Sequence, residues 1–406
     1  MLAIAQDRSG YIWFGTRSGL VRYDGVHLRN AYLKKADTTQ PIFTYITTIC
    51  AALKTGLWVG GADVFMRYNP QKNYFENVLI DGACPTAVNA MLEDRKGRLW
   101  IGSTSGLHLL LDSTKLAFRT FTPADGLAAK GVQALCEDEQ GNLWVGTENG
   151  LSKLTQKGDS FSWQTFKAAT APGNKVIHAD YITAIAEDGA RRLWIGTKHD
   201  GVSLFNPVTN TFTPYKHDSR QAGGLVNNIV RKIIFTRRGK IWIGTQEGIS
   251  IVDPTTLQFT SYQNEAGSEK SISQNSVHSL FEDGSGTVWV GTYFGGVNKV
   301  YGYNTRFNML QHKANVNSLS NNVVSSIVED DQSNLWIGTE GGGLNYYNRA
   351  TNSFSVYKNE PDNPNSPGSN LVKFVYLDGD KNTWIGTHGG GLNWLLTLKE
   401  RFWMVP

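Results

Sequence analysis

The stretches of this chain that look most suited to chemistry are glycine-rich loops that follow a tryptophan. The sequence "NLWIGTEGGGLN" at 334–345 recurs as "NTWIGTHGGGLN" at 382–393. Glycine-rich loops can bind phosphate through backbone N–H groups, but a phosphate loop also carries a lysine and leads into a helix, and these loops show neither feature. The GxxxxGK[ST], HExxH, GxSxG and GxGxxG motifs are absent as well. The common nucleotide-binding, zinc-protease and hydrolase sites are therefore not indicated.

Pairs of adjacent acidic residues are a second candidate for chemistry. Glu93 with Asp94 and Glu329 with Asp330 could suggest the opposed carboxylates of a glycosidase. The same pair occurs at one position in five copies of a repeat, so we interpret it as a turn-forming element. The eight histidines and three cysteines show no metal-ligand spacing, and we expect neither a metal nor a cofactor. His108 and His278 fall within expected strands, where a packed, hydrogen-bonded role is expected.

Loop residues that differ between the repeats are better candidates for a binding site. Arginine and carboxylate side chains form bidentate hydrogen bonds and aromatic rings offer flat apolar platforms, which together suit a sugar. The basic residues gathered between positions 175 and 220 would suit an acidic saccharide. The candidate ligand-binding residues are Arg17, Lys175, His178, Lys198, His199, Arg220, Tyr293, Glu340 and His388.

These loops belong to a repeat that fills the chain. Its tryptophans stand 42 to 50 residues apart, each is followed two residues later by glycine, and in seven copies aspartate stands six residues earlier. A catalytic loop has no reason to occur nine times, so the motif predicts a building block. The nine tryptophans are Trp13, Trp58, Trp100, Trp144, Trp194, Trp242, Trp289, Trp336 and Trp384.

Each copy carries four short strand signals, which in the eighth are "VSSIVED", "NLWIGTE", "GLNYYN" and "FSVYK". A period of this length with four strands predicts an all-β fold, a β-propeller of four-stranded blades. The glycine beside the tryptophan would let a neighbouring blade come close. The aspartate would form an Asx turn, a role in which asparagine should serve nearly as well. The second-to-third-strand loops and the links between blades should share one face.

Nine blades exceed the usual four to eight. We therefore expect a seven-bladed propeller at residues 1–312, followed at 313–406 by two blades that begin a second, truncated propeller. The first copy starts at its first strand and the last stops within its fourth, so both ends look cut.

Composition limits the partners. The 39 basic and 35 acidic residues leave a net charge of +4, far from that of a typical nucleic-acid-binding domain. No run of 18 apolar residues could span a membrane, and the start "MLAIAQDRSG" is not a signal peptide. Either the protein is cytoplasmic or its front is missing, and the repeats favour the second.

The repeat resembles that of the two-component regulator propeller family. The resemblance rests on "IAQDRSGYIWFGTRSGLVRYDG" at 4–25, "FTPADGL" at 121–127 and "SLSNNVVSSIVEDDQSNLWIGTEGGGLNYYN" at 318–348, and the repeat signature covers the whole chain. It implies the extracytoplasmic, periplasmic sensor of a hybrid two-component system typical of Bacteroidetes. It also implies immunoglobulin-like, membrane and kinase domains that are missing from this chain.

The leading functional hypothesis is a non-catalytic sensor region that binds a glycan fragment or another small ligand. One alternative is a propeller enzyme of the streptogramin-lyase type, in which His199 or His388 could serve as the base. Another is a scaffold for protein docking, which needs no pocket. Homodimerisation is left open.

Overall fold

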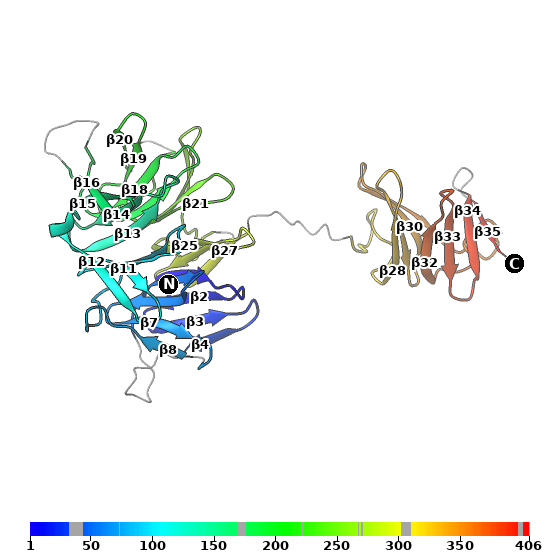
Figure 1. Ribbon diagram of the computed structural model, residues 1–406. Coiled ribbons are helices and arrows are strands. Elements are labelled where there is room, and N and C mark those ends of the chain that lie inside the picture. The colour runs from blue at the N-terminus through cyan, green and yellow to red at the C-terminus, as the bar shows by residue number, and fades with distance from the viewer. Residues whose placement is uncertain are drawn as a thin grey trace. The chain divides into compact units, whose positions relative to one another are not determined.

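The computed structural model describes residues 1–31, 44–72, 74–158, 160–168, 176–220, 223–266, 268, 271–301, 310–396 and 401–405. In this part of the chain, consecutive strands form nine antiparallel sheets, one for each repeat (Figure 1). We number these sheets as blades one to nine in chain order. Eight blades have four strands; blade seven has three, and its predicted fourth strand falls outside the described residues. The predicted all-β fold of four-stranded blades is confirmed.

The chain divides into two compact units, Met1–Asn304 and Thr305–Pro406. The first unit holds blades one to seven. Their strands are β1 (Ala3–Gln6), β2 (Ile12–Thr16), β3 (Gly19–Tyr23), β4 (Leu28–Ala31), β5 (Ile46–Ala52), β6 (Gly56–Gly61), β7 (Phe65–Asn69), β8 (Tyr74–Asn77), β9 (Ala90–Glu93), β10 (Leu99–Ser103), β11 (Gly106–Asp112), β12 (Ala117–Phe121), β13 (Val132–Glu137), β14 (Leu143–Thr147), β15 (Gly150–Lys157), β16 (Ser160–Phe166), β17 (Ile182–Glu187), β18 (Leu193–Thr197), β19 (Val202–Asn206), β20 (Thr211–Tyr215), β21 (Val230–Phe235), β22 (Ile241–Thr245), β23 (Gly248–Asp253), β24 (Gln258–Tyr262), β25 (Val277–Glu282), β26 (Val288–Thr292) and β27 (Val297–Val300).

A single turn of 3-10 helix, Pro123–Asp125, links blades three and four. The second unit holds blades eight and nine. Their strands are β28 (Val324–Glu329), β29 (Leu335–Thr339), β30 (Gly343–Asn348), β31 (Ser353–Tyr357), β32 (Val372–Leu377), β33 (Thr383–Thr387), β34 (Leu392–Leu396) and β35 (Arg401–Met404). The boundary at 312 and a second propeller that continues beyond these two blades stay predictions.

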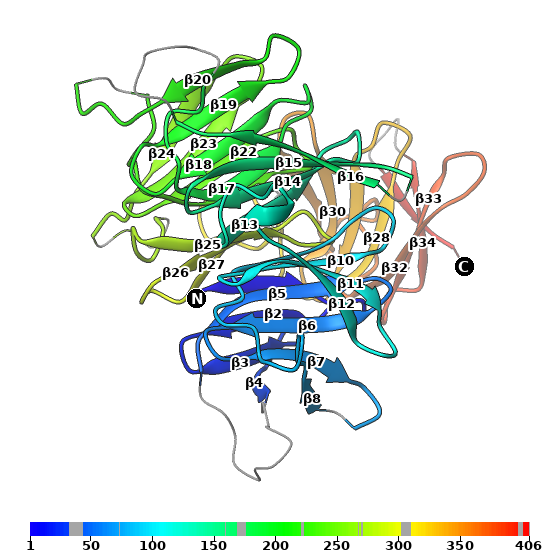
Figure 2. The same ribbon diagram turned by 60° about the vertical axis from the view of Figure 1, so that its left-hand side comes forward.

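The blades of the first unit stand in a ring. The first strand of each blade contacts the first strand of the next, from β1 through β5, β9, β13, β17 and β21 to β25. The strand β25 then contacts β1, and both views place the amino end of the chain beside β25 (Figures 1 and 2). The first strands therefore surround a central axis.

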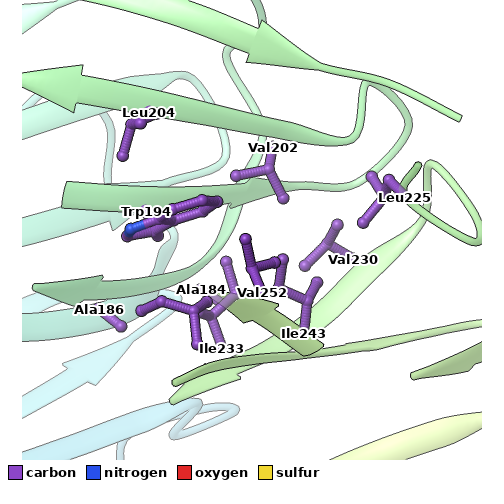
Figure 3. Packing of buried hydrophobic residues seen from close by; sticks show 11 residues of the cluster. Ala184, Ala186, Trp194, Val202, Leu204, Leu225, Val230, Ile233, Ile243 and Val252 are labelled. Carbon is purple, nitrogen blue, oxygen red and sulfur yellow. The ribbon is translucent and has the colours of Figure 1, made fainter. Parts of the chain in front are cut away.

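Tryptophan fills the space between neighbouring blades. Trp194 is fully buried between Val202 and Leu204 of its own blade and Val230 and Ile233 of the next (Figure 3). Because a buried indole contributes a large apolar area, these contacts provide much of the free energy that holds two blades together.

The indole N–H is satisfied by the aspartate six residues earlier. In six blades the tryptophan Nε1 donates to that carboxylate over 2.7 to 3.0 Å. The other carboxylate oxygen accepts backbone N–H groups, as Asp138 Oδ1 does from Gln140 and Asn142. The predicted Asx turn is thus present, and the carboxylate has a second role, orienting Trp144, that was not predicted.

The glycine two residues after the tryptophan marks the closest approach of two blades. A Cβ atom on Gly196 would lie 2.5 Å from Val230 Cγ1 of the next blade, and one on Gly146 would lie 2.6 Å from Ile182 Cγ2. The same contact closes the ring, since a Cβ on Gly291 would lie 2.8 Å from Met1 Cβ. No side chain fits at these distances, so the predicted role of the glycine is confirmed.

The acidic pairs link blades as well. The glutamate before the turn aspartate accepts a backbone N–H from the preceding blade, as Glu187 does from Glu139 and Glu137 from Arg95. Gln6 takes this place in blade one and accepts the N–H of Gly284 of blade seven. These pairs therefore form turns and inter-blade bonds.

The faces of the ring differ in the loops they carry. The second-to-third-strand loops bond to the links between blades, as in the 2.9 Å bond from Gly201 N to Asn228 O. We call this side the loop face. The aspartate turns connect the first and second strands and so lie at the other ends of these strands. The predicted sharing of one face is confirmed.

An Asx turn alone predicts a mild effect of Asp138→Asn, but the bond from Trp144 changes this expectation. We expect Asp138→Asn to reduce the free energy of unfolding by about 1 to 3 kcal/mol. Asparagine has one oxygen in place of two, so its N–H₂ group must face the N–H donors of Trp144 or Asn142. Urea denaturation measures the change. In Asp112→Asn, the matched control, the single oxygen Oδ1 accepts the backbone bonds from Thr114 and Lys115, and the change should stay below about 0.5 kcal/mol. Equal effects would contradict the second role of Asp138.

We expect Gly196→Ala to cost about 1 to 3 kcal/mol, because its methyl group would overlap Val230 and push blade six outward. The control is Gly224→Ala, at a glycine with open space where a Cβ would stand. The measurement is the denaturation midpoint of each variant. A wild-type midpoint for Gly196→Ala would show that blades five and six do not need this close approach.

Candidate ligand site

A channel of about 550 Å³ runs along the axis of the first unit. Three consecutive residues at the start of each of the seven first strands, or directly before it, line the channel and form three stacked rings. From the loop face inward, the rings are Leu2, Thr47, Asn89, Gln133, Thr183, Arg231 and His278; then Ala3, Thr48, Ala90, Ala134, Ala184, Lys232 and Ser279; then Ile4, Ile49, Met91, Leu135, Ile185, Ile233 and Leu280.

A bulge explains how successive residues reach the same channel. In a regular strand, neighbouring side chains point to opposite faces. The pairing of β21 with β22 shifts by one residue between Val230 and Lys232, and β5, β13, β17 and β25 show the same shift. The extra residue, Arg231 in blade six, is turned toward the axis together with its neighbour.

A second cavity of about 720 Å³ adjoins the channel. The two share Arg231, Gln246 and His278. The other residues that line the second cavity are Arg17, Glu247, Asn264, Ser273, Gln274, Asn275, Ser276 and Tyr293. Cationic, amide, hydroxyl and aromatic groups therefore meet where the channel opens on the loop face.

The rings and cations at this opening form a continuous stack. The Arg17 guanidinium lies 4.1 Å from the centre of the Tyr293 ring and donates a hydrogen bond to its hydroxyl. Tyr293 stacks on His278 with centroids 5.0 Å apart, and Arg231 Nη1 lies 2.8 Å from His278 Nε2. This stack joins blade one to blades six and seven across the closure of the ring.

The stack holds His278 in its neutral form. Burial, and after it the positive charge of Arg231, lowers the pKa of His278 to about 4. The imidazole is therefore uncharged at pH 7, and its Nε2 can accept the N–H of Arg231. Arg231 also donates to Gln246 Oε1 over 3.1 Å. The expected hydrogen-bonded strand histidine is present, but it also lines both cavities.

Blade five contributes a second cation and ring. Lys198 Nζ lies 4.4 Å from the centre of the Tyr181 ring, and both residues line the channel with His199. Lys198 and His199 are exposed in the loop between β18 and β19. An aromatic platform with adjacent donors thus stands on this side of the opening too.

The structure brings four of the nine candidate residues to these cavities. Arg17 and Tyr293 lie together at the second cavity, and Lys198 and His199 lie at the channel. His178 contacts Ser203 in blade five, and Arg220 pairs with Asp218 on the surface.

The structure does not bring the other five candidates to these cavities. Neither His178 nor Arg220 lines a cavity described here, and Lys175 lies outside the described residues. Glu340 and His388 belong to the second unit, where Glu340 pairs with Lys373 and His388 is exposed. His108, expected to be packed, is buried between the hydroxyls of Ser103 and Thr120.

Arg231, Lys232 and Gln246 were not among the candidates. The sequence contains a signal for two of them. Arg231 and Lys232 stand eleven and ten residues before Trp242, and the other six copies of the first unit carry no charged residue at these two distances from their tryptophan. This signal has a meaning only once the first strand is known to line a channel, which the repeat pattern does not show.

Among the described residues, no group of three or more His, Cys, Asp or Glu side chains could hold a metal ion. Within the same residues, no helix is long and apolar enough to cross a membrane.

Comparisons with known proteins agree with the repeat pattern. The model of the two component regulator propeller family matches residues 83–105, 126–149, 177–199, 271–294 and 318–341. A search of curated proteins gave no match. Among solved structures, the chain is similar to the extracellular domain of the putative hybrid two component system BT3049 from B. thetaiotaomicron. The TM-score is 0.62, with 26% identity over 100% of this chain and 52% of that chain.

Two further structures are similar. The extracellular domain of the putative one component system BT4673 from B. thetaiotaomicron has a TM-score of 0.60, with 21% identity over 99% of this chain and 51% of that chain. Virginiamycin B lyase from Staphylococcus aureus has a TM-score of 0.54, with 14% identity over 73% of this chain and 93% of that chain, a likeness of fold alone. The chain spans about half the length of the two extracellular domains. Five stretches of the chain thus match the two component regulator propeller repeat.

Proposed function

We propose that this chain is the ligand-sensing propeller region of an extracytoplasmic, hybrid two-component sensor, and that it binds an oligosaccharide without converting it. The observation that carries the proposal is the pair of adjoining cavities on the loop face, with aromatic rings and cations on both sides of the channel opening. The likeness to extracellular domains of two-component systems supports the sensing role.

The chemistry of the opening suits a sugar. Tyr293 and Tyr181 place aromatic side chains at the opening, beside which an apolar face of a sugar can lie. Arg17 and Lys198 donate charge-assisted hydrogen bonds beside those rings, and the amide of Gln246 can both donate and accept. The volume of the second cavity is in the usual range for small-molecule sites.

The proposal includes the rest of a signalling protein. In it, immunoglobulin-like, membrane and kinase domains would accompany this region, and the sugar would act in the periplasm. His199 stands at the opening and would contact the ligand as a hydrogen-bonding group and not as a catalytic base.

We expect the double variant Lys198→Ala, His199→Ala to bind the ligand roughly tenfold to a thousandfold more weakly, because each lost charge-assisted hydrogen bond contributes about 1.5 to 3 kcal/mol. Isothermal titration calorimetry of the full chain against neutral and acidic oligosaccharides measures the affinity. The unfolding curve should stay close to wild type, since both side chains are exposed.

A matched control is the double variant Lys115→Ala, His27→Ala, which removes an exposed lysine and an exposed histidine from third-to-fourth-strand turns. It should bind as the parent does. Parent-like affinity in the Lys198, His199 variant would place the ligand elsewhere. Chromatography of the oligosaccharide after long incubation should return it unchanged, and a cleaved or unsaturated product would favour a lyase.

A further inference from the structure

The second ring of the channel contains one residue unlike the others. Ten residues before each repeat tryptophan of the first unit, six blades place Ala, Thr or Ser toward the axis, and blade six places Lys232. In a repeat fold, a long cation at one position of a ring of small residues is not required for packing, because the other six blades pack without it. Lys232 therefore needs an explanation of its own.

Lys232 is an unpaired cation inside the channel. Among the described residues, no carboxylate forms an ion pair with its Nζ, and none of those that line the channel is Asp or Glu. The side chain is accessible within the channel, but the surrounding strands limit its contact with bulk water, and this burial lowers the pKa of its ammonium group. Lys198 and Arg231 add positive charge to the same channel.

Two buried polar atoms of the channel wall also lack partners. Arg231 uses its Nη atoms on His278 and Gln246, whereas its Nε has no hydrogen-bond partner among the described residues. Ser279 Oγ, in the same ring as Lys232, is buried and without a described partner too. Buried donors without an acceptor cost free energy. Both atoms are covered by the channel wall, so Lys232 is the donor that a ligand in the channel can reach.

We propose that Lys232 forms an oxyanion site in the channel, which takes a carboxylate, sulfate or phosphate group. Such a group accepts several N–H and O–H donors at once and neutralises the unpaired ammonium. The group is either a free inorganic oxyanion or the acidic substituent of a sugar bound at the channel opening. In the second case the inference rests on the proposed function and narrows its ligand to an acidic glycan.

The test is calorimetry of the full chain at constant ionic strength with sodium sulfate, sodium galacturonate and galactose. The variant is Lys232→Met, which keeps the length of the side chain and removes its charge, and the control is Lys115→Met at an exposed turn. We expect the parent and the control to bind at least one oxyanion, and Lys232→Met to bind it at least about tenfold more weakly.

A second readout separates this role from a structural one. Without any oxyanion, Lys232→Met should melt at the same temperature as the parent or higher, because it removes an uncompensated cation from the channel. Added sulfate should then stabilise the parent more than the variant. A lower melting temperature of the variant without oxyanion, together with equal oxyanion affinity, would overturn the site.

The three ligands of the calorimetry experiment also distinguish a free inorganic anion from the acidic group of a sugar. Binding of sulfate without galacturonate indicates a free inorganic anion, and binding of galacturonate without galactose indicates an acidic sugar. If neither oxyanion binds the parent, the proposal fails. If no oxyanion binds but a neutral oligosaccharide still binds through Lys198 and His199, only the oxyanion site is contradicted, and the proposed sensing role is not.

Discussion

The structure depends on how closely neighbouring blades approach one another behind each tryptophan. At Gly196 the next blade is so near that a single Cβ atom would lie 2.5 Å from Val230. The indole of Trp194 fills the adjoining space, and Asp188 satisfies its N–H from within a turn. Glycine, tryptophan and aspartate thus solve one packing problem together, because removing a side chain at one position makes room for the largest side chain at another.

Ring closure follows from the repetition of that contact, and the channel follows from the ring. The approach of Gly291 to Met1 joins blade seven to blade one, and the first strands then enclose the axis. The bulge in β21 turns Arg231 and Lys232 toward this axis together. Residues that do not take part in blade packing are free to differ between copies, so the channel and the loop face are where a single site can arise within a repetitive wall.

The sequence predicts the parts of this structure that the repeat constrains. Strand alternation in "LWIGT" places tryptophan and glycine on one face, and the period gives four strands to a blade, so the blades and the faces of their loops could be inferred. The channel lining could not, because it depends on a bulge, and an extra unpaired residue leaves no period in the sequence. For this reason loop variation singles out Lys198 and Tyr293, whereas Arg231 and Lys232 stand out only when the structure shows that their strand lines a channel.

The proposed ligand site is a single opening in a ring of structural repeats. A crystal structure of the chain with the oligosaccharide that binds in calorimetry tests the claim most directly. We expect electron density for a sugar between Tyr293 and Lys198, with any acidic substituent directed toward Lys232. Density confined to the outer edges of the blades, or to the second unit, would contradict it.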